Sequence, residues 1–362
     1  MSIGVLGSPR FVFSAATQQA RPCSAGRIGM SVSLDVLGIG NAIVDTISRA
    51  EDDVLVHAVL VKGSMALVDE SRADQLYELM GPTTVISGGS AANTMAGIAS
   101  LGATAGFVGK VKADAAGKEF THDIRKAGVA FDTPAATDGA ATARCLIFVT
   151  PDGQRTMNTF LGACQALGPS DIDDAAVAGA KILYMEGYLW DPPGAKEAFL
   201  RAAKISRANG RKVALTLSDS FCVGRYRDEF LSLIRDRVVD ILFANESELH
   251  ALYETADFDT AVAALRAEDG LLGVVTRSEK GCVVASRESL VAAPAFPVEE
   301  VVDTTGAGDL FAAGFLTGYA RGLPHEKSAA LGALAAAEII SHVGARPLKD
   351  LRQLARDNGL LA

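Results

Sequence analysis

Short apolar runs alternate with amphipathic segments along most of the chain, and this alternation predicts its architecture. Runs typical of strands cover 35–40, 83–86, 104–108, 181–185, 212–217, 239–243 and 271–276. Apolar residues at helical spacing occupy 71–80, 115–126, 194–209, 225–235, 246–253 and 260–267, and a further helix ends at Leu101. Strands that alternate with helices form a parallel sheet covered on both faces. We therefore expect an α/β fold with a doubly wound, mostly parallel sheet.

Two hairpins interrupt this rhythm. The runs 143–150 and 155–161 are joined by Pro151-Asp152-Gly153, which is a strong turn signal. A second hairpin joins 282–285 to 290–293 near the expected edge of the sheet. The helical pattern then returns over Leu310–Tyr319 and from about Pro324 to Ser341.

Polar residues gather directly after predicted strands or turns. The four clusters are Asn41–Asp45, Gly88–Asn93, Asn245–Glu248 and Thr305–Asp309. Ligands of open α/β sheets bind beyond the carboxyl ends of the strands. Polar residues scattered through a core would not be expected to collect at strand ends four times, so we expect the clusters to form one site.

Composition excludes several classes of protein. The 362 residues are 49% hydrophobic and carry a net charge of −9, which argues against nucleic acid or an anionic membrane as a partner. The uncharged stretch 82–109 contains too many glycines and polar residues for a membrane span. The five cysteines form no CxxC pair, so we do not expect a zinc site. They are typical of reduced thiols in a reducing compartment.

Residues 1–34 differ from the rest of the chain, because they contain Arg10, Arg21 and Arg27 and no acidic residue. Such a composition is typical of an organelle transit peptide. A disordered tail, or an upstream start with Met30 as the natural first residue, accounts for it equally simply. We therefore predict an N-terminal extension over 1–34 and a single folded region over 35–362. The expected location is cytoplasmic, with organelle targeting through 1–34 as the alternative.

The segment Gly306-Ala307-Gly308-Asp309 is suited to bind an anion. Small residues let backbone N–H groups approach an anion closely, and a helix over 310–319 would leave those N–H groups free in its first turn. A carboxylate inside such a cradle is useful if Asp309 removes a proton from a hydroxyl that attacks a phosphate. The alternative is an ordinary acidic helix N-terminus.

Two other nucleotide-binding motifs are absent. The segment Gly38–Asp45 lacks the third glycine of a dinucleotide-binding GxGxxG turn, which argues against a dehydrogenase. Gly117-Lys118 does not form a phosphate loop, because Lys112 stands where glycine is required and Glu119 follows the lysine.

Three motifs together resemble those of the ribokinase-like (PfkB-type) carbohydrate and nucleoside kinases, over about residues 35–350. Asp303–Asp309 resembles the family's C-terminal signature, Gly88–Asn93 its N-terminal signature, and Asn245–Glu248 its Asn-Glu-x-Glu motif. The four-residue separation of Asn41 and Asp45 is closer to adenosine kinases than to ribokinases. The resemblance implies a ribokinase-like fold with a small β-sheet lid, formed by segments near 46–68 and 129–161, that excludes water from the reaction.

The resemblance also implies a role for each matching residue. Asp309 would be the general base, and the backbone amides of Gly306, Ala307 and Gly308 would bind the transferring phosphoryl group. Arg155 would contact phosphate, although an exposed hairpin charge explains it as well. The acceptor would be bound by Asn41, Asp45, Gly88, Gly89, Ser90 and Asn93.

The nucleotide side is matched less completely. Asn245, Thr276, Ser278 and Gly281 would lie beside ATP, although Arg277-Ser278 departs from the family's usual small residue and glycine. Asn245 and Glu248 would hold Mg²⁺ through water, and a capped helix start is the alternative explanation of this motif. Asp303 and Thr305 would contribute to a monovalent-cation site, which K⁺ would occupy.

We therefore expect an ATP- and Mg²⁺-dependent kinase that phosphorylates the primary hydroxyl of a ribosyl acceptor, with adenosine, converted to AMP, as the first candidate. A ribose or fructose kinase of the same family is the alternative, and a non-catalytic binding protein on the same fold is a remote one. The sequence does not decide between a monomer and a dimer.

Overall fold

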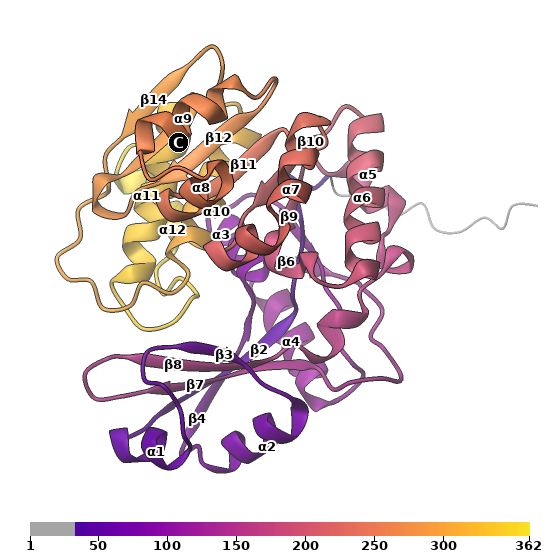
Figure 1. The fold of residues 1–362 in the computed structure, drawn as a ribbon, viewed down its shortest axis with the longest axis vertical. Coiled ribbons are helices and arrows are strands. Elements are labelled where there is room, and N and C mark those ends of the chain that lie inside the picture. The colour runs from indigo at the N-terminus through magenta and orange to yellow at the C-terminus, as the bar shows by residue number, and fades with distance from the viewer. Residues whose placement is uncertain (1–32) are drawn as a thin grey trace, which may run out of the picture. The chain divides into compact units, whose positions relative to one another are not determined.

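A computed structural model describes residues 33–362, so the extension predicted over 1–34 lies almost wholly outside the described residues. The described chain contains a large sheet of nine strands in the order β14-β13-β12-β11-β10-β9-β1-β5-β6 (Figure 1). Its strands are β1 (Val36–Ile39), β5 (Ala105–Val108), β6 (Val129–Phe131), β9 (Ile182–Glu186), β10 (Lys212–Thr216), β11 (Ile241–Asn245), β12 (Leu272–Thr276), β13 (Cys282–Ala285) and β14 (Leu290–Ala293). Neighbouring strands are parallel from β6 to β12, and only β13 and β14 are antiparallel.

The large sheet is buried on both faces, which explains why its strands are continuous apolar runs. Alternate residues of β9 enter different hydrophobic clusters: Ile182 and Tyr184 one, Leu183 and Met185 the other. One cluster includes α3 (Ser90–Ser100), α4 (Ala115–Lys126), α10 (Ala307–Ala320), α11 (His325–Ile340) and α12 (Leu351–Asp357). The other includes α5 (Asp174–Gly179), α6 (Pro193–Ala208), α7 (Ser220–Arg235), α8 (Glu246–Tyr253) and α9 (Phe258–Ala267). The predicted doubly wound α/β fold is confirmed.

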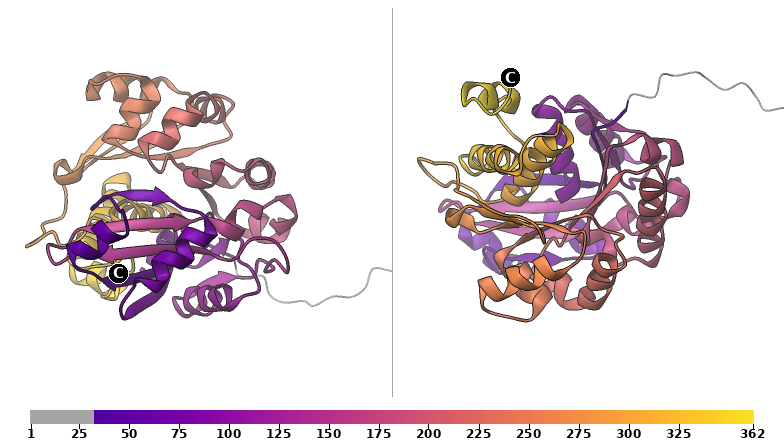
Figure 2. Two further views of the ribbon diagram at one scale, coloured as in Figure 1. Left: turned by 60° about the horizontal axis from the view of Figure 1, so that its bottom comes forward. Right: turned by 90° about the horizontal axis from the view of Figure 1, so that it is seen from above.

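A second sheet has five strands in the order β3-β8-β7-β2-β4. They are β2 (Ile43–Arg49), β3 (Met65–Leu67), β4 (Thr83–Gly88), β7 (Ala143–Val149) and β8 (Arg155–Phe160). The helices α1 (Asp52–His57) and α2 (Glu70–Glu78) pack on one face through a small apolar cluster that includes Leu76 and Phe148. Figure 1 shows these two helices at the bottom, with the sheet between them and the larger part of the fold, and Figure 2 shows the same arrangement from two other directions.

The small sheet differs from the predicted lid segments at two places. Val129–Phe131, which lies inside the predicted segment 129–161, pairs with β5 in the large sheet, so that segment enters the small sheet only at Ala143. The strand β4, outside both predicted segments, forms the edge of the small sheet beside β2. Among residues 33–362, no helix combines the length and apolar character that crossing a membrane requires.

Candidate active site

The candidate catalytic carboxylate lies where two helix N-termini meet. Asp309 is in the first turn of α10, and its Oδ1 accepts a hydrogen bond from Ser90 Oγ at 2.6 Å. Its Oδ2 accepts from Asn93 Nδ2 at 3.0 Å, so the first turn of α3 supplies both donors. Burial raises the pKa of Asp309 above its usual 3.8, although these two hydrogen bonds and the charge of Arg346 oppose the rise. The structure thus joins the predicted base to two predicted acceptor-binding residues.

The predicted anion cradle forms the turn into α10. Gly306 is the N-cap residue and has a φ of 79°, a left-handed conformation that glycine adopts without strain. The N–H of Ala307 donates to Thr304 O at 3.2 Å, so it is already used within the turn. Gly308 is exposed, and within the described residues its N–H has no acceptor. Among residues 33–362, two of the three predicted cradle residues, Gly306 and Gly308, therefore keep an N–H without an acceptor, which an anion could use.

Gly308 offers a test of this cradle. A Cβ at Gly308 would meet no atom within 4 Å, so Gly308→Ala should leave the melting temperature unchanged or slightly raised. It should still lower kcat/KM by about tenfold or more, because the added methyl would obstruct a phosphoryl group that binds backbone N–H groups closely. Steady-state kinetics and thermal unfolding check both expectations. Gly168→Ala is the control, since a Cβ there is equally unobstructed; unchanged kinetics in Gly308→Ala would contradict the cradle.

Asp45 on β2 is the acidic side chain of the predicted acceptor site. Gly88 lies against it, since a Cβ at Gly88 would stand 2.3 to 2.5 Å from the atoms of the Asp45 carboxyl group. Burial raises the pKa of Asp45 to about 6, against the opposing positive charges of Arg346 and Arg155. Gly89 follows with a φ of 96°, which turns the chain from β4 into α3. Asp45, Gly88 and Gly89 are therefore adjacent, as predicted.

Asn41 is hydrogen-bonded to Glu186, a residue that no sequence motif indicated. Its Nδ2 donates to Glu186 Oε1 at 2.6 Å, and the other oxygen of Glu186 accepts from Ala91 N at 2.8 Å. Glu186 ends β9, is 1% exposed, and burial raises its pKa to about 7. The only signal in the sequence was an acidic residue that ends the buried run Ile182–Met185.

Two buried acceptor atoms in this region have no donor. Asn41 Oδ1 and Asn93 Oδ1 are both enclosed by protein and unpaired within the described residues. A buried carbonyl oxygen without a partner costs free energy, and native structures rarely leave one unsatisfied. Hydroxyl groups of a bound polyol would supply such donors.

Arg155 is buried and ion-paired with Asp303, which corrects the alternative of an exposed hairpin charge. Its Nε has no partner among the described residues, so the predicted phosphate contact stays a prediction. Asp303 also accepts from Gly344 N and Thr305 N, each at 3.0 Å. Burial raises the pKa of Asp303, but these N–H bonds and the charge of Arg155 outweigh it and hold the pKa below 3.8. A carboxylate occupied by a guanidinium and two N–H groups does not fit the predicted K⁺ site at Asp303 and Thr305.

Asn245 and Glu248 form a capping box at the start of α8. Asn245 Oδ1 accepts from Glu248 N at 2.8 Å, and Glu248 Oε2 accepts from Asn245 N at 3.0 Å. Glu248 is buried, and this burial raises its pKa to about 7. Residues 33–362 contain no cluster of three acidic, histidine or cysteine side chains that would hold a metal. The pair fits only a Mg²⁺ ion held mainly by water and phosphate oxygens.

The remaining nucleotide-side residues follow β12. Thr276 ends this strand and is the register partner of Asn245 on β11. Arg277 pairs with Glu246 and stacks over Phe258 at 3.5 Å. Ser278 has a φ of 51°, a left-handed conformation that glycine adopts more easily than serine. The Arg277-Ser278 pair lies between Thr276, at the end of β12, and Gly281.

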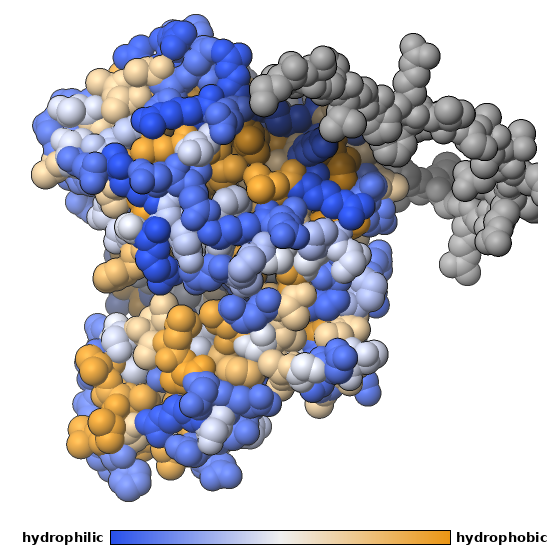
Figure 3. All heavy atoms as spheres, turned by 45° about the vertical axis from the view of Figure 1, so that its right-hand side comes forward, coloured by the Kyte–Doolittle hydropathy of each residue, from blue (hydrophilic) through white to orange (hydrophobic). Residues whose placement is uncertain are grey.

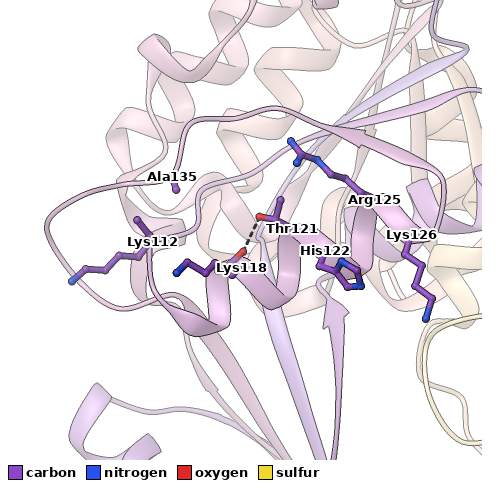
Figure 4. Close-up of a pocket in the computed structure, with 9 residues that line it drawn as sticks. Lys112, Lys118, Thr121, His122, Arg125, Lys126 and Ala135 are labelled. Atoms are coloured by element: carbon purple, nitrogen blue, oxygen red, sulfur yellow. Dashed lines mark hydrogen bonds between the residues drawn. The ribbon is translucent and has the colours of Figure 1, made fainter.

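A separate cavity of about 620 Å³ lies against α4 and contains none of the predicted site residues. Figure 4 shows that its walls carry basic side chains, which include Lys112, Lys118, His122, Arg125 and Lys126. Lys112 and Arg125 are already bonded, to Gly139 O and to Phe131 O and Asp132. The candidate active site is thus defined by the contacts of Asp309 and Asp45 and not by this cavity.

Known proteins resemble this chain in sequence and in fold. Residues 61–351 match the model of the pfkB family of carbohydrate kinases. An ATP-dependent ribose-1-phosphate kinase from Halopiger xanaduensis is 32% identical over 68% of this chain and 79% of its own length. The adenosine kinase of Saccharomyces cerevisiae is 27% identical over 84% of this chain and 94% of its own.

Solved structures agree with these sequence matches. The adenosine kinase from Sinorhizobium meliloti is 53% identical with a TM-score of 0.84, covering 90% of this chain and 100% of that one. A probable sugar kinase from Rhizobium etli is 50% identical with a TM-score of 0.85, covering 91% and 99%. The matched region spans most of the described residues and includes Asp309, the Gly306–Gly308 turn and the Ser87–Asn93 segment. This chain is therefore a kinase of the pfkB carbohydrate kinase family.

Proposed function

We propose that this kinase transfers the γ-phosphoryl group of ATP to the primary hydroxyl of a ribosyl acceptor, and that adenosine is its preferred acceptor. The observation that carries the proposal is the placement of Asp309 between Ser90 and Asn93, next to the free N–H of Gly308. A base next to an anion cradle suits a reaction in which a hydroxyl is deprotonated as it attacks a phosphate. The nearby unpaired oxygens of Asn41 and Asn93 match the hydroxyl donors of a sugar.

Each site residue has a separate role in the proposed phosphoryl transfer. Asp309 accepts the proton of the attacking hydroxyl, and the N–H groups of Gly306 and Gly308 stabilise charge on the transferring group. Asp45 accepts hydrogen bonds from the ribosyl diol. Thr276, Ser278 and Gly281 lie on the side where ATP binds. Glu248 and Asn245 would hold Mg²⁺, which when bound supplies charge neutralisation for the phosphates.

The small sheet favours a nucleoside over a free sugar. Strand register places Ile47, Ile147, Met157 and Met65 in one row across the sheet, on the face that also carries Asp45. Met65 and Leu67 at the edge are 49% and 58% exposed. Figure 3 shows apolar side chains gathered on the lower part of the molecule, which contains this sheet. An apolar row beside a hydroxyl-binding carboxylate suits a flat nucleobase attached to a ribosyl group.

A sugar kinase remains the second candidate, because Asp45 and the unpaired oxygens of Asn41 and Asn93 would bind any polyol. Relatives that are sugar kinases support it, among them a fructokinase from Klebsiella pneumoniae that is 29% identical over 77% of this chain. A non-catalytic binding protein would need neither Asp309 nor the cradle, and this chain retains both.

ATP consumption across adenosine, inosine, guanosine, ribose and fructose distinguishes these candidates. We expect the highest kcat/KM with adenosine, because only a purine nucleoside fills both the apolar row and the hydroxyl site. Met65→Ser should raise the KM for adenosine and leave the KM for ATP unchanged. Robust turnover of a free sugar without turnover of adenosine would overturn the choice of acceptor, and no turnover of any acceptor would overturn the proposed function.

A further inference from the structure

Arg346 contacts the segment Ser87–Asn93, which carries predicted acceptor-binding residues and is called the acceptor segment below. It lies outside every motif identified in the sequence. Its Nη2 donates to Ser87 O at 2.7 Å and to Ser87 Oγ at 2.9 Å, and its Nε donates to Ser87 O at 3.1 Å. Its Nη1 donates to Ala92 O at 2.7 Å. Ser87 directly precedes Gly88, and Ala92 directly precedes Asn93. One planar guanidinium therefore bonds to both ends of the segment that carries Gly88, Gly89, Ser90 and Asn93.

The charge of Arg346 faces carboxylates on three different elements. They are Asp45 on β2, Asp123 on α4 and Asp309 on α10. Asp123 is also tied to the same segment, since its Oδ2 accepts from Ser87 N at 2.8 Å and from Ser87 Oγ at 2.6 Å. Arg155 on β8 is the other cation that acts on Asp45. Within the part of the chain that the structure describes, Arg346 is the one positive charge that acts strongly on Asp309.

The loop that carries Arg346 is itself fixed at both sides. Glu338 Oε1 accepts from Leu348 N and Lys349 N, each at 3.0 Å, and interacts with His342 Nε2 at 3.2 Å. Gly344 N donates to Asp303, just before the anion cradle. A short, anchored loop holds a long side chain in one orientation at little further entropic cost. The loop therefore links the cradle to the acceptor segment.

We propose that Arg346 is a positioning residue for phosphoryl transfer, which fixes the Ser87–Asn93 segment and offsets the negative charge of Asp45 and Asp309. It touches neither the acceptor nor ATP and acts through these residues. The inference rests on the proposed function, because it takes Asp45 as an acceptor ligand and Asp309 as the base. Without Arg346, two carboxylates in one half-buried site would compete to remain ionised.

The test compares Arg346→Met and Arg346→Lys with a matched control, Arg321→Met. Arg321 also donates to a backbone carbonyl of the α3 region, Leu101 O at 3.1 Å, but at the opposite end of that helix. We expect Arg346→Met to raise the KM for adenosine by about tenfold or more, because it removes several charge-assisted hydrogen bonds. The KM for ATP should stay unchanged. Arg321→Met should have wild-type kinetics.

The pH dependence of kcat/KM distinguishes a role of the Arg346 charge in positioning from a merely structural role. Loss of the positive charge raises the pKa of both carboxyl groups, so the acid limb of kcat/KM should move to higher pH in Arg346→Met. Arg346→Lys keeps the charge but not the fork of donors, so it should retain the wild-type acid limb with a raised KM for adenosine. If Arg346→Met does not fold, the Lys variant alone still tests the fork.

The outcomes are distinguishable from a failure of the proposed function. Absence of turnover of every acceptor by the wild-type chain overturns the proposed function. Wild-type turnover, combined with an unchanged KM for adenosine in both Arg346 variants, overturns the positioning of the segment. A raised KM with the acid limb unmoved in Arg346→Met overturns the charge contribution.

Discussion

Replacing Asp309 by asparagine should lower kcat by about 10²–10⁴-fold, which is the contribution typical of a positioned general base. Asparagine has nearly the same shape, and its carboxamide still accepts one of the two hydrogen bonds that Ser90 and Asn93 now donate. It cannot accept the proton of an attacking hydroxyl. We expect the dissociation constant of ATP, measured by calorimetry, to stay near the wild-type value.

The control for this substitution is Asp257→Asn. Asp257 is another acidic residue at a helix N-terminus, where it caps α9 by accepting from Thr260 N at 2.8 Å. Asparagine is an equally good cap, so this variant should keep wild-type kinetics and stability. If Asp309→Asn behaves like Asp257→Asn, Asp309 is only an acidic residue in the first turn of a helix and the assignment as base is wrong.

The pH dependence of the wild-type enzyme should report the same group. Burial raises the pKa of Asp309 above 3.8, and only the ionised carboxylate accepts a proton. Activity should therefore fall as the pH falls through this raised value, and not only below pH 3.8. Asp45, with a pKa raised to about 6, should contribute to the same acid limb through acceptor binding.

The second large effect is expected for Gly88→Ala. The new Cβ would stand 2.3 Å from Asp45 Oδ2, so the carboxyl group or the strand must move. Gly88 has no left-handed φ, so backbone strain does not contribute to the loss. Overpacking of this kind destabilises a protein by about 1–3 kcal/mol. We expect the displaced Asp45 to raise the KM for adenosine by about tenfold or more, since a charged hydrogen-bonding group is lost from the acceptor.

Gly81→Ala is the matched control, because a Cβ there would make only an ordinary contact, 3.7 Å from Ser48 Oγ. Initial rates measured at varied adenosine concentrations and at varied ATP concentrations would give the KM for adenosine and the KM for ATP separately. A KM for adenosine that stays at the wild-type value in Gly88→Ala would show that Asp45 does not bind the acceptor. A rise in the KM for ATP alone would place Gly88 on the nucleotide side.

Local sequence patterns predicted the large sheet because its strands are buried on both faces. Such strands are continuous apolar runs, and the runs at 181–185, 212–217 and 271–276 appear in the structure as β9, β10 and β12. The strand β2 was harder to predict from the sequence, because its buried residues Thr46 and Ser48 are polar. Val129–Phe131 was placed in the wrong sheet because three residues carry no information about their partner strand.

The candidate site was predictable where glycine-rich turns mark it and not where single charged residues complete it. Asp309, Ser90 and Asn93 belong to short motifs whose residue types indicate their chemistry. Glu186 and Arg346 are isolated in the sequence and gain their roles only from contacts with Asn41 and Ser87, 145 and 259 residues away. The burial of Arg155 was not predictable for the same reason, since only the folded chain brings it to Asp303.

Within the described residues the chain passes between the two sheets four times, and two of these passages contain predicted acceptor-binding residues: Asn41 between β1 and β2, and Gly88–Gly89 at the end of β4. The acceptor is therefore expected to bind at two of the connections between the sheets. The affinity for an acceptor thus includes the free energy of the orientation of the small sheet. The apolar cluster around Leu76 contacts no acceptor. We nevertheless expect substitutions in this cluster to change the affinity for the acceptor.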